Sequence, residues 1–268
     1  RLVPAVASIA DTWRLGVHVH VHDPDLLEEL LEFLVPALDS NSIVAITQTA
    51  PQAVGLRGLE AVVGGNTIVR MVEERGRDIL PFLSLVTEGA FDDCDGVLKL
   101  HTRRFLHRAD GEAWRQALLA GLLGSPEAIF AWKVELMRGA ALVFPRTSYS
   151  SDWCLSESQP ILESMFDELG WSHRRPLVRF PAGSMFACSR EWIYALRTLD
   201  TRRGVFDHEV QSPDHGPEHA FECFFGALAI ELEGRLFGGG GSGELSQGLG
   251  ALGRGHGGEF ASQGSARD

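Results

Sequence analysis

Valine and histidine alternate near the start of the chain, in "LGVHVHVHD". This period of two predicts a strand over residues 14–22, with the valines on one face and the histidines on the other. Leucines at helical spacing follow in "DLLEELLEFLVPAL", and Asp23 and Pro24 are residue types that favour the start of a helix. The chain therefore begins with a predicted strand and a predicted amphipathic helix.

The same two periods recur along the chain. Further strands are predicted in "SIVAITQT", "NTIVRMVEE", "CDGVLKLHT", "GAALVFP" and "RPLVRFPAGSMFACSR". Helices are predicted in "ILPFLSLV", with Asp78 as its N-cap, and in "DGEAWRQALLAGLLGSP", "REWIYALRTL" and "HAFECFFGALAIELEGRLF". The apolar side chains of the last helix are expected in the core, with contact to lipid as the alternative. Glycine dominates residues 238–268, which we expect to form a disordered tail.

Strands that alternate with helices are typical of an α/β fold with a mostly parallel central sheet flanked by helices. Ligands of such sheets bind at the carboxyl ends of the strands. Four polar segments follow predicted strands in this chain: "HVHD", "ERGRD", "HTRR" and "PAGS". If those strands are parallel, the four segments share one edge of the sheet, and this edge is the expected functional site.

The 268-residue chain carries a net charge of −12, which argues against a nucleic-acid partner. Against this acidic background, Lys99, His101, Arg103 and Arg104 gather at the end of a predicted strand. Arginine and lysine donors match phosphate oxygens, so the cluster predicts the binding of a diphosphate. A solvated loop whose cations pair with neighbouring carboxylates is an equal alternative.

The four cysteines are far apart in sequence and form no CxxC pair, which favours reduced thiols over a disulfide framework. The first residues contain no basic stretch followed by an apolar run, so we expect no signal peptide. Both observations favour a cytoplasmic protein.

The "ERGRD" segment offers a second set of polar groups. Gly76 allows a sharp turn or the close approach of a ligand. Asp78 could accept hydrogen bonds from a ribose or a base, or it could cap the helix that follows, and the two roles can coexist.

The histidine stripe supports a rival interpretation. Alternate strand residues point to one face, so His18, His20 and His22 could ligate one metal ion. Such a set is similar to the metal site of hydrolases of the amidohydrolase type, which need an eight-fold barrel and further ligands. Too few strand–helix units are predicted for that barrel, and buried polar histidines or ligand contacts are the commoner outcome.

A stretch rich in acidic residues and histidine precedes the last helix, in "FDHEVQSPDHGPEHAFE". A general base must be a carboxylate or an imidazole held near the hydroxyl group that loses its proton. Glu209, Glu218 and His219 are candidates for this role. A solvated acidic turn is the alternative, with Glu222 lying on the helix surface.

Several segments, in their order along the chain, resemble the rhamnan synthesis F family of bacterial polysaccharide-assembly proteins. They are "VHVHVHDPDLLEELLEFL", "ERGRDILPFL", "VLKLHTRR", "DGEAWRQALLAGLLGS", "LVFP", "FPAGSMF" and "HAFE", and they span roughly residues 16–226. The resemblance implies a single Rossmann-like glycosyltransferase A-type domain over residues 1–237, with a nucleotide-sugar half near 1–105 and an acceptor half near 106–237. It implies transfer of a sugar, with dTDP-rhamnose as the expected donor, to a cell-surface polysaccharide or a lipid-linked glycan.

The resemblance also implies roles for single residues. The loop after the first strand would lie beside the nucleobase, and the "ERGRD" segment would hold the nucleoside. The segment "PAGSMF" is similar to the part of the family that lines the acceptor side. The implied donor-binding residues are His22, Asp23, Arg77, Asp78, Lys99, His101, Arg103 and Arg104, and the implied acceptor-binding residues are Gly183, Ser184 and Met185.

Many A-type enzymes hold a divalent metal ion on the diphosphate with a "DxD" motif at the end of this strand. The present chain has cations there and no carboxylate, so we expect these side chains to replace the metal, with no cofactor, and a divalent metal is the alternative. His219 is the favoured base, ahead of Glu218 and then Glu209, with Glu222 as its orienting partner. Direct displacement by the acceptor oxygen would invert the anomeric carbon.

The chain departs from the family pattern at several positions. Phe105 stands where the family has a serine, and Glu74 where it has an asparagine. Ala187 replaces an aromatic residue and Cys223 an arginine, both on the acceptor side. The competing functions are a metal-dependent hydrolase built on the three histidines and a non-catalytic binding module in polysaccharide assembly. A lipid-linked acceptor would place the enzyme at the inner face of the plasma membrane, in peripheral contact with it.

Overall fold

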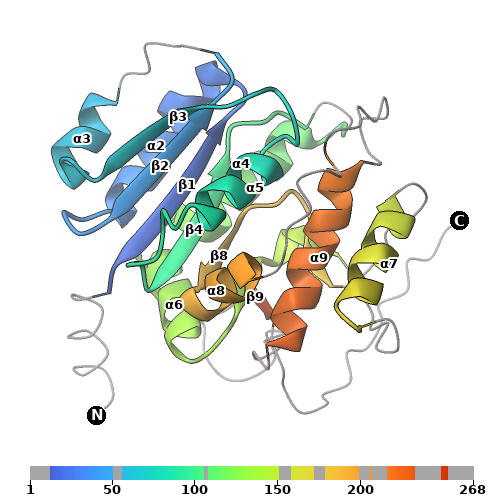
Figure 1. The fold of residues 1–268 in the computed structure, drawn as a ribbon. Coiled ribbons are helices and arrows are strands. Elements are labelled where there is room, and N and C mark those ends of the chain that lie inside the picture. Colours follow the sequence, from blue (N-terminus) through green and yellow to red (C-terminus); the bar gives the residue numbers. More distant parts are fainter. Residues whose placement is uncertain are drawn as a thin grey trace, which may run out of the picture.

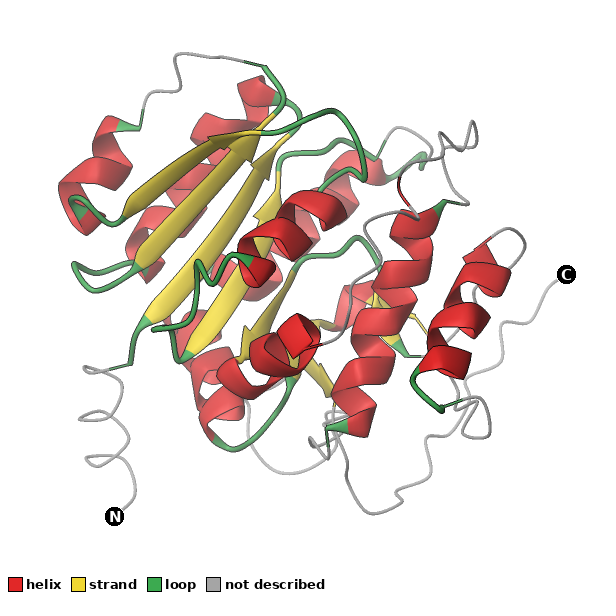
Figure 2. Cartoon of the chain, in the orientation of Figure 1, coloured by secondary structure: helices red, strands yellow, loops and turns green. Residues whose placement is uncertain are grey.

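The computed structural model describes residues 13–50, 56–105, 108–150, 158–171, 179–198, 206 and 216–232, and the backbone of 249–252. A central seven-stranded sheet is covered by helices on both faces (Figures 1 and 2). The predicted α/β class and the mostly parallel sheet are confirmed. The strands of this sheet are β1 (Leu15–Val21), β2 (Ile43–Gln48), β3 (Thr67–Met71), β4 (Gly96–His101), β5 (Leu142–Pro145), β8 (Phe186–Ser189) and β9 (Leu249–Leu252).

The helices follow the strands in the order expected for α/β units. A separate two-stranded sheet pairs β6 (Tyr149–Ser150) with β7 (Phe180–Pro181). The helices are α2 (Leu27–Leu34), α3 (Arg57–Val63), α4 (Ile79–Thr87), α5 (Gly111–Leu123), α6 (Pro126–Met137), α7 (Ser158–Glu168), α8 (Arg190–Thr198) and α9 (Pro217–Glu231).

The strand order is β3-β2-β1-β4-β8-β5-β9. β1 is parallel to β2 and β4, and β2 is parallel to β3, whereas β8 is antiparallel to both β4 and β5. The chain winds outward from β1 to β3 and then returns to the other side of β1 with β4. The order therefore reverses between β1 and β4, and the carboxyl ends of these two strands form a topological switch point.

The predicted clustering of four polar segments at one edge is confirmed, but one of them reaches it by a different route. "HVHD", "ERGRD" and "HTRR" follow the parallel strands β1, β3 and β4. "PAGS" precedes β8, and the pairing of Lys99 with Phe186 places the start of this antiparallel strand beside the end of β4. The amino end of β8 thus lies at the same edge as the carboxyl ends of its neighbours.

The sheet separates two apolar cores. Val17 and Val19 face the core formed with α2, α5 and α6, whereas Val97 and Phe186 face the core formed with α4, α7, α8 and α9. Figure 1 shows α4, α8 and α9 in front of the sheet. The apolar side chains of α9 are buried, with Phe225 fully buried, so the prediction that this helix belongs to the core is confirmed.

Three helices were not predicted from the sequence: α3, α6 and α7. For α6 the reason is visible, because "GSP" ends α5 and also starts the next helix. The Ser125 hydroxyl accepts a hydrogen bond from the Ala128 backbone N–H at 3.2 Å, and Pro126 occupies the first turn. The same residues therefore supply a stop signal and a start signal.

The tail and the cysteines differ from expectation where they are described. Leu249–Leu252 forms β9, paired antiparallel with β5, so at these four residues the structure has a strand in place of predicted disorder. The other residues of 238–268 lie outside the described part. Cys94 and Cys188 are free and buried, in line with reduced thiols, but Cys223 is disulfide-bonded, which corrects the expectation for that residue.

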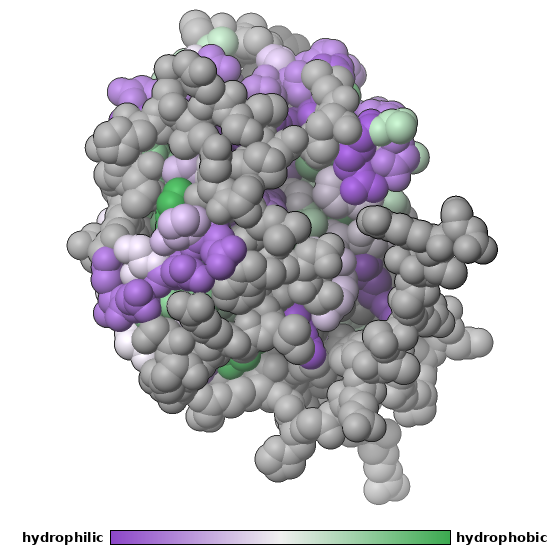
Figure 3. Space-filling view, turned by 90° about the vertical axis from the view of Figure 1, so that its right-hand side faces the viewer, coloured by the Kyte–Doolittle hydropathy of each residue, from purple (hydrophilic) through white to green (hydrophobic). Residues whose placement is uncertain are grey.

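Within the described ranges no single helix is long and apolar enough to cross a membrane, although the bent pair α5 and α6, at 68°, meets the length and composition criteria together. On the side of the molecule shown in Figure 3, most of the described surface is hydrophilic and apolar residues show in small separate patches.

A close helix–backbone contact gives a test of the fold. A Cβ atom added at Gly226 in α9 would lie 1.7 Å from the Arg179 carbonyl oxygen, whereas one added at Gly58 in α3 would meet nothing within 4 Å. We expect Gly226→Ala to lower the free energy of unfolding by about 1–3 kcal/mol, because the backbone must shift. Gly58→Ala should keep or raise it by up to about 1 kcal/mol. Urea unfolding measures both, and equal stability of the two variants would contradict the α9 packing.

Candidate functional site

A buried ion pair lies beneath the polar edge of the sheet. Lys99 on β4 is fully buried, and its Nζ donates to the Asp78 carboxylate, to the Ser184 hydroxyl and, at 3.0 Å, to the Ser184 carbonyl. The Ser184 hydroxyl in turn donates to Asp78. We call these three residues the Lys99 cluster. Lys99 and Ser184 were expected to touch the donor and the acceptor, but the structure uses both as internal partners of Asp78.

Asp78 is also not the helix cap that the sequence predicted. It occupies the N-cap position of α4, but its side chain makes no capping hydrogen bond. Burial alone would raise the pKa of this carboxyl group, but the Lys99 ammonium, with His101 and the hydrogen bonds from Lys99 and Ser184, outweighs burial. The pKa of Asp78 is therefore held well below its usual value, and the carboxylate stays ionised.

The Lys99 cluster joins two turns of unusual backbone conformation. Arg77 and Ser184 are the non-glycine residues of the described part with positive φ, at 50° and 58°. Each follows a glycine that also has positive φ, Gly76 at 65° and Gly183 at 83°. Such conformations persist where the surroundings enforce them. Here Asp78 and Ser184, both bound to Lys99, fix the two turns against each other.

His101 is fixed in one neutral tautomer. Its Nε2 donates to the Gly183 carbonyl at 2.8 Å, and its Nδ1 accepts from the Arg103 backbone N–H at 3.1 Å. Burial lowers the pKa of this imidazole, more than the nearby Asp78 raises it. His101 therefore orients the loop after β4 and the turn before β8.

The two histidines of β1 and His22 just after it do not form a metal site in the described part of the chain. The Thr47 hydroxyl lies 2.9 Å from His18 Nε2 and 2.9 Å from His20 Nδ1, so the two rings share one hydroxyl. His18 also stacks on Phe82, and His22 is exposed. Across the described ranges no group of three or more His, Cys, Asp or Glu side chains is placed to hold a metal ion. The rival metal interpretation thus lacks its ligand set at this position.

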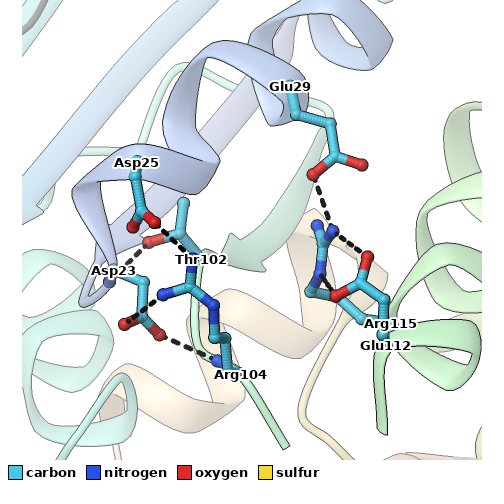
Figure 4. Close-up of polar contacts among 7 residues, drawn as sticks. All are labelled: Asp23, Asp25, Glu29, Thr102, Arg104, Glu112 and Arg115. Carbon is cyan, nitrogen blue, oxygen red and sulfur yellow. Dashed lines mark hydrogen bonds and ion pairs between the residues drawn. The ribbon is translucent and has the colours of Figure 1, made fainter. Parts of the chain in front are cut away.

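The loops after β1 and β4 are bound to each other (Figure 4). The Thr102 hydroxyl accepts from the backbone N–H groups of His22 and Asp23, both at 3.0 Å. Asp23 accepts from the Arg104 backbone N–H at 2.9 Å and from Arg104 Nη1 at 3.0 Å, while Arg104 Nη2 pairs with Asp25. Asp23 and Arg104, both expected to bind the donor, are used here to hold the two loops together.

A cavity of about 280 Å³ opens above the Lys99 cluster, and we call it the central cavity. It brings together predicted residues from both halves of the chain. Several of the predicted residues do not line it, among them Lys99, Asp23, Arg104, Ser184 and Met185. Met185 is fully buried in the core with α5. Those that do line it are Arg77, Asp78, His101, Arg103, Gly183, Glu218, His219 and Glu222.

Two arginines give the central cavity its positive side. Burial lowers the pKa of the Arg103 guanidinium, and the neighbouring Arg77 lowers it further, while Asp78, Glu222 and Glu218 act in the opposite direction. The Arg103 side chain has no hydrogen bond or ion pair with any other described residue. A half-buried cation beside a second cation is a site that favours an anion.

The central cavity is also lined by a histidine–glutamate pair on α9. His219 Nδ1 lies 3.1 Å from the Glu222 carboxylate, one helical turn further on. The Phe180 ring packs edge-on against the imidazole at 5.6 Å between centroids. A carboxylate on Nδ1 favours the tautomer whose Nε2 accepts a proton. Glu222 thus lies where the predicted orienting partner of His219 should lie. Glu209, the third candidate for the base, lies outside the described residues.

Sequence reasoning gave no site role to five residues of the central cavity: Ile79, Phe105, Arg108, Trp114 and Ala182. Phe105 stood out as a departure from the family pattern, which was the available signal for it. Trp114 occupies a helix whose other large apolar residues are in the core, so nothing in the sequence separated it from them.

The chain is an α/β domain whose cations, histidines and carboxylates gather at a topological switch point, the place where open α/β sheets bind their ligands. The family profile described as Rhamnan synthesis protein F matches residues 2–233 of this chain. The chain belongs to this family, which confirms the resemblance seen in the sequence.

Curated relatives extend beyond this chain. Two proteins from Xanthomonas campestris pv. campestris, each named Uncharacterized protein WxcX, are 29% identical to it over 243 residues. The match covers 86% of this chain and 33% of each relative. The chain therefore spans about a third of the length of the curated relatives it matches.

The buried histidines predict a loss of stability in acid. Burial lowers the pKa of His20 from 6.5 to about 4, so the folded protein keeps this imidazole neutral where the unfolded chain binds a proton. Below pH 6.5 protons therefore favour unfolding, and His20 alone should cost about 2 kcal/mol at pH 5 relative to pH 7.5. Urea unfolding at both pH values measures this loss. It should shrink in His20→Asn and persist in His22→Asn, and an equal loss in both variants would show that His20 is not its source.

Proposed function

We propose that the domain is a glycosyltransferase that transfers a sugar, with rhamnose expected, from a nucleoside-diphosphate sugar to a polysaccharide or lipid-linked glycan. The observation that carries this proposal is Arg103, a half-buried guanidinium without an ionic partner among the described residues, beside Arg77 in the central cavity. In a chain of net charge −12, such a pair fits a strongly anionic ligand.

The fold supports a nucleotide ligand. In open α/β sheets, ligands bind in the crevice outside the carboxyl ends of the strands at the switch point, here between β1 and β4. Strands β3, β2, β1 and β4 follow the order 3-2-1-4 of the dinucleotide-binding sheet, and the antiparallel β8 extends it. This arrangement favours the A-type domain that the family resemblance implies.

The arginines would stabilise the leaving group. As the bond between the anomeric carbon and the diphosphate oxygen breaks, negative charge grows on the diphosphate, and Arg77 and Arg103 supply fixed positive charge there. Two of the three carboxylates beside them are already engaged, because Asp78 is bound by Lys99 and Ser184 and Glu222 pairs with His219, which leaves Glu218 as a single carboxylate for a metal ion among the described lining residues. We therefore propose a mechanism in which guanidinium groups take the part of the metal.

His219 would accept the proton of the acceptor. The acceptor hydroxyl oxygen attacks the anomeric carbon from the side opposite the diphosphate, and its proton passes to His219 Nε2. Glu222 stabilises the imidazolium that forms, through Nδ1. One displacement of this kind inverts the anomeric configuration. We propose action in the cytoplasm, at the inner face of the membrane if the acceptor is lipid-linked.

Neighbouring arginines give a matched test of the donor site. Arg103→Ala should weaken dTDP or UDP binding about ten- to hundredfold, because a charged hydrogen-bond donor to the diphosphate is lost, while the melting temperature of the free protein holds. Arg104→Ala should lower the melting temperature, because Asp23 and Asp25 lose their partner, and leave nucleotide binding nearly intact.

Thermal shift with each nucleotide, with and without EDTA, measures both effects. A wild-type protein that no nucleotide stabilises would contradict the glycosyltransferase proposal. A shift that EDTA abolishes would show that a metal ion is required.

The proposed base is tested by transfer rates with saturating donor. His219→Ala should lower kcat about 10²- to 10⁴-fold with little change in nucleotide affinity, because only proton removal is lost. Glu222→Gln should cause a smaller fall, since the imidazole remains. Glu127→Gln, exposed on α6, is the control. If Glu218→Gln abolishes transfer while His219→Ala retains it, Glu218 is the base.

A further inference from the structure

One wall of the central cavity has no part in the chemistry described above. It consists of Phe105 after β4, Arg108, and Trp114 in the first turns of α5, and we call it the Trp114 wall. These side chains line the same cavity as the arginine pair and His219. An aromatic wall with a few polar groups opposite it is the usual composition of a small-molecule site.

The Trp114 indole is held firmly in place. Its ring centroid lies 4.5 Å from that of Phe105, with the planes at 63°, and the Arg108 guanidinium carbon lies 4.3 Å from the indole centroid. The indole Nε1 donates to the Thr147 carbonyl at 3.2 Å. A ring fixed by contacts on several sides loses little further freedom when a ligand binds, which favours affinity.

The Trp114 wall is continuous with the Lys99 cluster through Gly183. A Cβ atom at Gly183 would lie 2.8 Å from Cη2 of Trp114, and the φ of this glycine is 83°. The carbonyl of the same residue accepts the His101 hydrogen bond at 2.8 Å. The turn therefore fixes the distance between the indole and the strand end that carries Arg103.

We propose that the Trp114 wall binds a sugar ring, an assignment that rests on the proposed glycosyltransferase function and extends it. A pyranose presents C–H groups on one face, and these pack on aromatic surface while its hydroxyl groups need donors or acceptors. Arg108 gives two nitrogens, Nε and Nη2, to Asp110 at 3.0 and 2.9 Å, and its Nη1 has no hydrogen bond among the described residues. That nitrogen can donate to a hydroxyl group.

The position of the wall favours the sugar of the acceptor. The arginine pair accounts for the diphosphate of the donor, and His219 on α9 has to meet an acceptor hydroxyl within the same cavity. A 6-deoxyhexose such as rhamnose carries a methyl group in place of a hydroxymethyl group and offers more apolar surface to the indole. The residues first expected to hold the acceptor, Ser184 and Met185, are buried below this surface.

The experiment compares Trp114→Leu, Trp114→Phe and Arg108→Ala with Phe130→Leu, which removes an exposed aromatic ring on α6 away from the cavity. Saturation-transfer NMR with methyl α-L-rhamnoside measures binding of a free sugar, and calorimetry measures dTDP and dTDP-rhamnose. Melting temperatures show whether each variant is folded. If Trp114→Leu does not fold, Arg108→Ala, which changes a more exposed residue, tests the wall in its place.

We expect Trp114→Leu to weaken rhamnoside binding about fivefold or more, Arg108→Ala to weaken it as well, and Trp114→Phe to retain most of it. Phe130→Leu should match the wild type, and the affinity for dTDP should change less than about twofold in every variant. If the variants leave rhamnoside binding intact and remove the affinity difference between dTDP-rhamnose and dTDP, the ring is that of the donor.

Two outcomes would overturn the proposal. One is a wild-type protein that binds neither the rhamnoside nor dTDP-rhamnose, and the other is a folded Trp114→Leu that binds both of these ligands as the wild type does. Failure of the proposed function looks different. In that case no nucleotide binds, while the rhamnoside still binds in a Trp114-dependent way, and the wall is the sugar site of a non-catalytic carbohydrate-binding domain.

Discussion

Lys99 is a fully buried ammonium group, and such a charge is tolerated because the Asp78 carboxylate and the Ser184 hydroxyl and carbonyl surround it. This ion pair joins three distant parts of the chain: the centre of β4, the start of α4 and the turn before β8. Both turns that meet there have backbone conformations which non-glycine residues rarely adopt. The arginine side of the central cavity and the Gly183 carbonyl that orients His101 both depend on it. The buried charge is thus a constraint on geometry more than a source of net stability.

The cations at the end of β4 have separate tasks, although they are neighbours in sequence. Lys99 points into the core, His101 is neutral and bound to Gly183, and Arg104 holds the loops after β1 and β4 together. Arg103 lines the central cavity as a cation without an ionic partner in the described residues, and the neutral His101 lines it as well. The alternation of a strand explains part of this division, and the Asp23 and Asp25 carboxylates explain the rest. Internal ion pairing is confirmed for Lys99 and Arg104, whereas ligand binding stays a proposal for Arg103.

The period-two and helical patterns were sufficient to predict β1, β2, β3, β4 and α9, because those segments are long and regular. They missed α6, because the same serine–proline pair ends one helix and begins the next. They also predicted that the Asp78 side chain caps α4, whereas this carboxylate is bound by Lys99. The convergence of strand ends in a parallel sheet brought Arg77 and Arg103 to one site, and the family resemblance added His219. It could not show which cations would find carboxylates elsewhere in the chain, as Arg104 does 81 residues away. It also could not distinguish Trp114 from the core residues of its helix. The position of Trp114 at the cavity depends on the Gly183 turn, which lies 69 residues further along the chain and contacts the indole.

The three sides of the central cavity differ in the chemistry they offer. Arg77 and Arg103 carry positive charge, His219 with Glu222 is the proposed proton acceptor, and the Trp114 wall offers apolar surface with one donor nitrogen at Arg108. A sugar transfer needs all three kinds of group, because it separates a diphosphate from a carbon, removes a proton from a hydroxyl and must hold the ring between them. A hydrolase would need only the first two, with water as acceptor. The aromatic wall is therefore the feature that most favours a bulky acceptor over water, and a closely packed sugar would also keep water away from the donor.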